Sequence, residues 1–180
     1  IGLRNPQGLL YDQKNKKIYI SEHGPQGGDE INVISNLKVV PNFGWPISSY
    51  GEHYGHSKRD RSDTYKIAPL LKSHKKHGFE EPLKFFTPSI GISQIEFMYN
   101  KSEEQINNTL IVTSMGNKSE EGDLSIHFLT LKANKVIAHK IVNLDERIRD
   151  IIFIKEKNKY ILFLETSTSI GVIDLDNINN

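Results

Sequence analysis

The stretch that decides the fold is residues 17–34, KIYISEHGPQGGDEINVI, in which two strand-like runs flank a polar turn. Residues 17–21 are rich in β-forming side chains, and residues 30–34 alternate polar and apolar side chains, as a half-buried strand does. Residues 21–30 between them hold three glycines and a proline, which allow a sharp change of direction. The stretch therefore predicts two neighbouring strands joined by a tight turn.

The same short, β-like pattern continues along the chain. Further strands are predicted at 83–87, 91–99, 108–115, 123–132, 135–142, 149–155, 159–165 and 169–174. Turns are predicted at Asn107–Asn108, at Asn134–Lys135 and at 155–158. No stretch shows a sustained apolar period of about 3.6 residues. Many short strands separated by turns indicate an all-β sandwich, barrel or propeller.

One segment breaks this pattern. From about residue 48 to residue 81 the chain is polar, basic and rich in histidine, with little strand signal. A loop of this length inside a compact domain is usually functional or partly disordered.

Composition excludes several classes of protein. The 180 residues carry 23 Lys and Arg against 22 Asp and Glu, and this balance argues against a nucleic-acid binder. There are no cysteines, so disulfides and thiolate metal sites are excluded. No apolar run approaches the roughly 18 residues of a membrane span. The length suits one domain over residues 1–180.

The turn of residues 21–30 is the densest candidate site. Its carbonyl groups, with the carboxylates of Glu22, Asp29 and Glu30, suit a hard cation such as Ca²⁺, which takes oxygen ligands. The alternative is a tight turn whose acidic side chains are merely solvated, because no EF-hand spacing is present.

Two arginine motifs suggest an anionic ligand. Arg4 and Asn5 open the run RNPQG, which precedes the first predicted strand. Arg147 and Arg149 open a later strand, and alternation of side chains points both the same way. Guanidinium groups bind carboxylates in a planar fork. The alternative is a solvated strand edge, with Arg147 and Arg149 paired to nearby acids.

Two histidine pairs have the H-x-x-H spacing, one at His53 and His56 and one at His74 and His77. Imidazole is a common zinc ligand. The pairs lie in a polar segment with no predicted helix to hold them, however, and neighbouring lysines repel a cation. Zinc is therefore the less favoured interpretation.

Together, these motifs resemble the soluble glucose/sorbosone dehydrogenases, and most closely their aldose sugar dehydrogenase branch. The motifs that carry the resemblance are RNPQG (4–8), SEHGP (21–25), GGDEIN (27–32), NFGWP (42–46), FTPSI (86–90), LIVTS (110–114) and RIRD (147–150). They cover nearly the whole chain, and the first fifty residues carry the most specific part.

The resemblance implies a six-bladed β-propeller that uses pyrroloquinoline quinone (PQQ) and Ca²⁺ to oxidise an aldose to a lactone or acid. At about 40–45 residues a blade, 180 residues supply about three to four blades. We therefore expect the chain to form the C-terminal half of a longer dehydrogenase-like polypeptide, completed by the part that precedes Ile1. The resemblance also implies a periplasmic or secreted protein. The electron acceptor is not encoded in these motifs.

The resemblance also implies roles for individual residues. The positions that match cofactor-binding residues are Arg4, Asn5, His23, Phe86, Arg147 and Arg149. The carbonyl groups of Gly24 and Pro25 match ligands of the cofactor-bound Ca²⁺. Glu30 and the carbonyl of Phe43 match a second calcium site of the aldose branch. The chemistry agrees, because arginines neutralise the carboxylates of PQQ and Ca²⁺ polarises its quinone.

The sequence departs from the family pattern in three places. The catalytic histidine of the family lies upstream of the RNPQG motif, so we expect it before Ile1 and assign no base here. The lysine of the glucose-oxidising branch is Gly116 in this chain, with Lys118 two residues on. Phe86 stands where a tryptophan is common.

The alternative function is a calcium-stabilised propeller module that binds a partner without catalysis, or an incomplete fragment.

Overall fold

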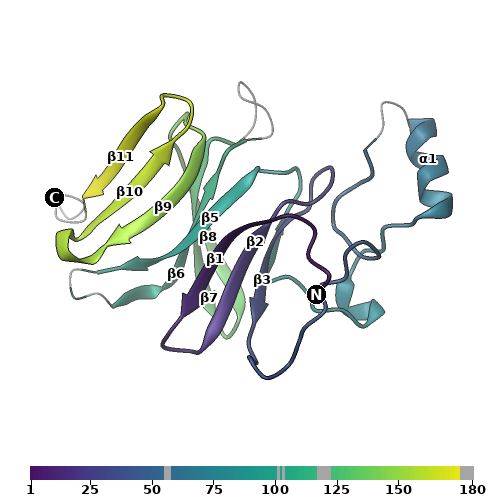
Figure 1. Cartoon of the computed structure of the whole chain (residues 1–180), viewed down its shortest axis with the longest axis horizontal. Coiled ribbons are helices and arrows are strands. Elements are labelled where there is room, and N and C mark those ends of the chain that lie inside the picture. Colours follow the sequence, from purple (N-terminus) through teal and green to yellow (C-terminus); the bar gives the residue numbers. More distant parts are fainter. Residues whose placement is uncertain (55–57, 101, 103, 117–122, 175–180) are drawn as a thin grey trace. The chain divides into compact units, whose positions relative to one another are not determined.

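A computed structural model of the chain describes residues 1–54, 58–100, 102, 104–116 and 123–174. The chain divides into two compact units, Ile1–Ile90 and Gly91–Asn180, and strands predominate in both (Figure 1). No helix among these described residues is long and apolar enough to cross a membrane.

The first unit is built on one antiparallel sheet with the strand order β1-β2-β3-β4. Its strands are β1 (Pro6–Asp12), β2 (Lys17–Glu22), β3 (Asp29–Ile34) and β4 (Lys84–Phe86). The predicted turn joins β2 to β3. The register of these two strands pairs Glu22 with Glu30, which places two carboxylates side by side.

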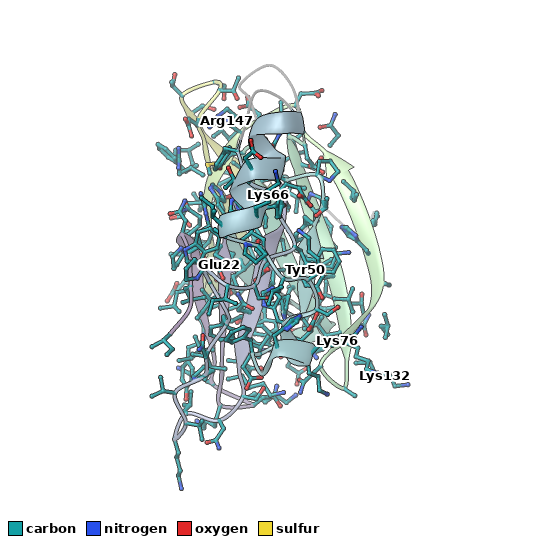
Figure 2. The ribbon with its side chains drawn as sticks, turned by 90° about the vertical axis from the view of Figure 1, so that its right-hand side faces the viewer. Glu22, Tyr50, Lys66, Lys76, Lys132 and Arg147 are labelled. Carbon is teal, nitrogen blue, oxygen red and sulfur yellow. The ribbon has the colours of Figure 1, made fainter. Side chains whose placement is uncertain are left out.

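A long insertion separates β3 from β4. It contains α1 (Lys58–Ile67) and the 3₁₀ helix η1 (His74–His77), and Figure 2 shows Lys66 on α1 and Lys76 on η1. The sequence predicted only a polar loop here, because the residues of α1 show no apolar stripe that would indicate a helix. The helix is anchored instead through Tyr65, whose hydroxyl donates to Glu52 and whose ring packs edge-on against His53.

The second unit contains two antiparallel sheets. The first consists of β5 (Ile92–Tyr99), β6 (Gln105–Ser114), β7 (Ser125–Lys132) and β8 (Lys135–Asn143). The second consists of β9 (Ile148–Ile154), β10 (Lys159–Leu164) and β11 (Ser169–Asp174), with the 3₁₀ helix η2 (Lys155–Lys157) between β9 and β10. Their shared core contains Ile111, Ile126, Ile148, Phe153 and Tyr160. Burial of these apolar side chains drives the packing of the two sheets.

Two local predictions were wrong. Residues Pro6–Gly8 were predicted to precede the first strand, but they begin β1, and the register shifts between Pro6 and Gly8. Asn107 and Asn108 were predicted to form a turn, but they lie within β6 with φ of 48° and 50°. Asparagine tolerates this left-handed conformation, so the same chemistry produced an irregular strand rather than a reversal.

Candidate functional site

The turn between β2 and β3 is held by backbone contacts that only glycine permits. A Cβ on Gly24 would lie 2.1 Å from the carbonyl oxygen of Gly27 and 2.4 Å from that of Gly28. The N–H of Gly28 donates to the carbonyl of Phe86 at 2.8 Å. The turn therefore brings the carbonyl oxygens of Gly27 and Gly28 close to Gly24, and such oxygens are the donors that a hard cation prefers.

Asp29 holds this turn in place and is fully buried. Its Oδ1 accepts from the N–H of Gly24 at 3.2 Å. Its Oδ2 accepts from the Ser89 hydroxyl at 2.7 Å and from the N–H of Ile90 at 3.1 Å. Because both oxygens are used within the unit, Asp29 positions the turn, whereas the sequence had suggested it as a cation ligand.

Arg4 lies beside this turn and near two aromatic rings. Its guanidinium donates to the carbonyl of His23 at 3.0 Å. Its Cζ lies 5.3 Å from the Trp45 ring centre and 6.0 Å from the Tyr54 ring centre. The Tyr54 hydroxyl donates to the carbonyl of Pro25 at 2.7 Å, which links the insertion to the turn. Trp45 and Tyr54 thus restrict Arg4 through cation–π contacts, a role that the sequence did not indicate.

The other predicted cofactor residues of this unit lie around the same turn. The carbonyl of Asn5 accepts from the N–H of His23 at 3.0 Å. His23 lines a cavity of about 10 Å³ together with Arg4 and Gly24. Phe86 is 6 % exposed, and its carbonyl accepts from the N–H of Gly28 in the turn. The structure therefore brings Arg4, Asn5 and His23 together, while Phe86 contacts the turn through its backbone and its ring is buried in the core.

Two carboxylates are buried beside Arg4. The side-chain amide of Asn32 donates to Glu22 at 2.7 Å and to Glu30 at 3.3 Å (Figure 2 labels Glu22). Burial raises the pKa of Glu22, despite hydrogen bonds from the N–H groups of Arg4 and Asn5. Burial, together with the charge of Glu22, raises the pKa of Glu30 to about 8. The two acids are therefore costly to ionise without a cation.

His74, on the insertion, completes this cluster. Its Nδ1 lies 2.9 Å from the carbonyl of Phe43, and its Nε2 lies 3.4 Å from Oε1 of Glu30. The ring is 1 % exposed and stacks on Tyr50. Burial lowers the pKa of His74, so this contact is not a strong ion pair between charged groups. The sequence did not predict that His74 would meet Glu30.

The H-x-x-H pairs do not converge on a metal. His77 is exposed while His74 is buried, and Nε2 of His53 contacts the carbonyl of Ala68. His56 lies outside the described residues. Among the residues that the structure describes, no three His, Cys, Asp or Glu side chains are placed to hold one metal ion. A cation here would therefore need carbonyl, amide or water oxygens to complete its ligands.

The second unit contributes Arg147 and Arg149. Arg149 donates through Nε at 3.1 Å and through Nη2 at 2.7 Å to one oxygen of Glu165. Arg147 lies 3.6 Å from the other oxygen and donates to the carbonyl of Met115. The two arginines therefore hold one carboxylate between them. The acid is Glu165 rather than the neighbours that the sequence offered as alternatives. Gly116 follows Met115, and Lys118 is outside the described residues.

Each unit, taken by itself, holds groups that suit part of what the family resemblance implies. In the first unit, the glycine-dependent turn offers carbonyl oxygens, the donors that Ca²⁺ prefers, and Arg4 places a positive charge next to it. Arg147 and Arg149 already bind a carboxylate, which is the group that PQQ presents. The predicted second calcium site fits less well. A nitrogen, Nε2 of His74, lies 3.4 Å from Oε1 of Glu30, whereas calcium prefers oxygen ligands.

Several known proteins resemble the chain. The aldose sugar dehydrogenase YliI of Escherichia coli K12 is 28% identical over 168 residues, covering 92% of this chain and 40% of that protein. Quinoprotein glucose dehydrogenase B of Acinetobacter calcoaceticus is 41% identical over 58 residues, covering 32% of this chain and 11% of that protein. The chain thus spans less than half the length of these relatives.

Solved structures agree with the sequence relatives. A crystal structure of a glucose dehydrogenase matches with a TM-score of 0.70 at 26% identity, over 95% of this chain and 44% of that chain. These matches and the antiparallel sheets confirm the predicted fold class, all-β and of the six-bladed propeller type. The sequence model of the glucose/sorbosone dehydrogenase family matches residues 1–172, and the chain belongs to that family.

Proposed function

We propose that the polypeptide containing this chain is a PQQ- and calcium-dependent dehydrogenase that oxidises an aldose to a lactone or acid. The family and the names of the relatives support a sugar dehydrogenase. The observation that carries the proposal is Arg4, which lies near the rings of Trp45 and Tyr54 and next to a turn in which the carbonyls of Gly27 and Gly28 crowd against Gly24. The location is proposed to be periplasmic or secreted.

The residues of this chain would bind and orient the cofactor. Arg4, Arg147 and Arg149 would each bind carboxylate groups, and the carbonyls of Gly24 and Pro25 would hold Ca²⁺. Asn5 and His23 would add polar contacts beside Arg4. When bound, PQQ with Ca²⁺ supplies an acceptor for the hydride from the sugar C1. The base for the sugar hydroxyl is predicted in the part of the polypeptide before Ile1.

The insertion would shape access to this site. Tyr54 connects it to the carbonyl of Pro25, and the bridge between Gln26 and Glu52 joins it to the turn. Deleting the outer part of the insertion, α1, should therefore change the relative kcat/KM values for different aldoses. Unchanged selectivity would refute this role.

The experiment that tests the function is reconstitution of the full-length polypeptide with PQQ and Ca²⁺. We expect dye reduction with a panel of aldoses to require both additions. A folded, calcium-loaded protein that binds no PQQ would favour the alternative, a propeller module that binds a partner without catalysis.

A further inference from the structure

The base of the insertion, residues 50–54, lies as a strap against the turn between β2 and β3. Gln26 of the turn and Glu52 of the strap exchange two backbone hydrogen bonds, with N···O distances of 3.0 and 2.9 Å. A Cβ on Gly28 would lie 2.1 Å from the backbone nitrogen of Gly51, so no side chain fits between the two segments at this point. The strap therefore has a fixed position on the turn.

Tyr54 ends the strap and makes two separate contacts with groups of the candidate site. Its hydroxyl donates to the carbonyl of Pro25 at 2.7 Å. Its ring centre lies 6.0 Å from Cζ of Arg4, at the range of a cation–π contact. Tyr54 is 65% exposed, so packing in the core does not explain where it lies. Its position follows instead from these two contacts and from the strap.

We propose that Tyr54 is a positioning residue for the cofactor: its hydroxyl orients the Pro25 carbonyl, and its ring restricts the Arg4 guanidinium. This role rests on the proposed function, in which that carbonyl is a ligand of Ca²⁺ and Arg4 binds PQQ. A carbonyl oxygen has two lone pairs, so it can accept from Tyr54 and still bind a cation. Groups held in place before binding lose less freedom when the ligand arrives, which strengthens binding. Tyr54 lies outside every motif that carries the family resemblance.

Contacts that do not involve Tyr54 limit how large its effect should be. The Arg4 guanidinium also donates to the carbonyl of His23 at 3.0 Å and lies 5.3 Å from the Trp45 ring centre. The strap is joined to the turn by backbone atoms, which a substitution at Tyr54 leaves in place. Loss of the Tyr54 side chain should therefore loosen Arg4 and the Pro25 carbonyl while the turn stays folded.

Two variants separate the two contacts. Tyr54→Phe removes the hydroxyl and keeps the ring, whereas Tyr54→Leu removes both. PQQ binding to the chelator-treated, full-length protein is measured by equilibrium dialysis at increasing Ca²⁺ concentration. We expect both variants to need about 5–10-fold more Ca²⁺ than wild type for half-maximal binding, because both lose the hydrogen bond to Pro25. At saturating Ca²⁺, Tyr54→Phe should bind PQQ like wild type, and Tyr54→Leu should bind it about 2–5-fold more weakly, because only Tyr54→Leu loses the ring over Arg4.

The matched control is Tyr65→Phe, which removes a hydroxyl of the same insertion that donates to Glu52. We expect this variant to keep the wild-type Ca²⁺ requirement. The proposal would be overturned if Tyr54→Phe left that requirement unchanged, or if Tyr65→Phe raised it as much. Urea unfolding checks that each variant folds, and Tyr54→Phe alone decides the outcome if Tyr54→Leu does not. Wild type that binds no PQQ at any Ca²⁺ concentration would contradict the proposed function itself, a result distinct from wild-type binding that Tyr54→Phe does not alter.

Discussion

Acidic side chains near the predicted site residues differ between the two units, although burial also raises the pKa of Glu96 in the second unit. In the second unit, Glu165 is bound by Arg147 and Arg149. Burial works against the charge of Asp123, yet hydrogen bonds from His127, Ser125 and Ser114 outweigh it and lower the pKa of Asp123. In the first unit, burial raises the pKa of both Glu22 and Glu30.

This difference distinguishes acids whose contacts stabilise the fold from acids whose surroundings suit a bound ligand. Asp123 already has internal partners, so its contacts stabilise the fold. In the first unit, Asn32 donates to both acids and the N–H groups of Arg4 and Asn5 donate to Glu22, yet burial still outweighs these contacts. A bound cation, or a pH at which the acids are protonated, would stabilise this arrangement.

The largest effect is expected from Gly24→Ala. A Cβ would overlap the carbonyl groups of Gly27 and Gly28, so the turn must open. We expect a loss of about 2–4 kcal/mol of unfolding free energy, measured by urea denaturation. In the control, Gly171→Ala, the nearest atom would be a leucine methyl group at 3.1 Å, which can move. Equal stability of the two variants would contradict the account of the turn.

The pH dependence of stability should reflect Glu30. Its pKa is about 8 in the folded protein and near 4.5 when unfolded, so the folded state holds more protons between these values. In the presence of a chelator, the free energy of unfolding should therefore fall by a few kcal/mol as the pH rises from about 5 to 8. Glu30→Gln should flatten this fall. Wild type that becomes more stable over the same interval would refute the assignment.

Tyr160→Phe tests the closed network of the second unit. The Tyr160 hydroxyl donates to the carbonyl of Phe97 at 2.8 Å and accepts from the N–H of Tyr99 at 2.7 Å. Removing it breaks both hydrogen bonds, at an expected cost of about 1–3 kcal/mol in thermal or urea unfolding. Tyr11→Phe, at a side chain 46% exposed, should change stability by less than about 0.5 kcal/mol. Similar costs for the two would argue against the network.

The smallest effect is expected from Glu165→Gln. Glu165 competes with a ligand carboxylate for Arg147 and Arg149, so the variant should bind PQQ about 2–5-fold more tightly. Stability should change little, because these side chains are partly exposed. Weaker PQQ binding would mean that Glu165 positions the arginines rather than competing for them. Glu156→Gln, on the exposed helix η2, is the control.

Much of the fold could be predicted, because strands leave a clear local signal. The turn at Asn134 and the turn at residues 155–158 were predicted and are present, with Asn134 and Asn158 in the left-handed region. α1 could not be predicted, because its contacts to Glu52 and His53 come from elsewhere in the insertion. β1 was missed because Pro6 and Gly8 are typical of loops.

Sequence analysis could predict only those site residues that lie within short motifs. Arg4, Gly24 and Glu30 could be singled out because they lie in motifs that resemble a family. His74 and Glu165 carry no local signal, because their partners are 44 and 16 to 18 residues away. Only the fold brings such groups together. Asp29 looked like a ligand in sequence, and its contacts show that it supports the turn.

The most direct test of the proposed function is equilibrium binding of PQQ to the chelator-treated, full-length protein, with and without Ca²⁺. The account predicts saturable binding that requires Ca²⁺ and that Arg4→Ala and Arg147→Ala each weaken by about 10–100-fold, as expected for a lost hydrogen bond to a charged group. A folded protein loaded with Ca²⁺ that does not bind PQQ would contradict it.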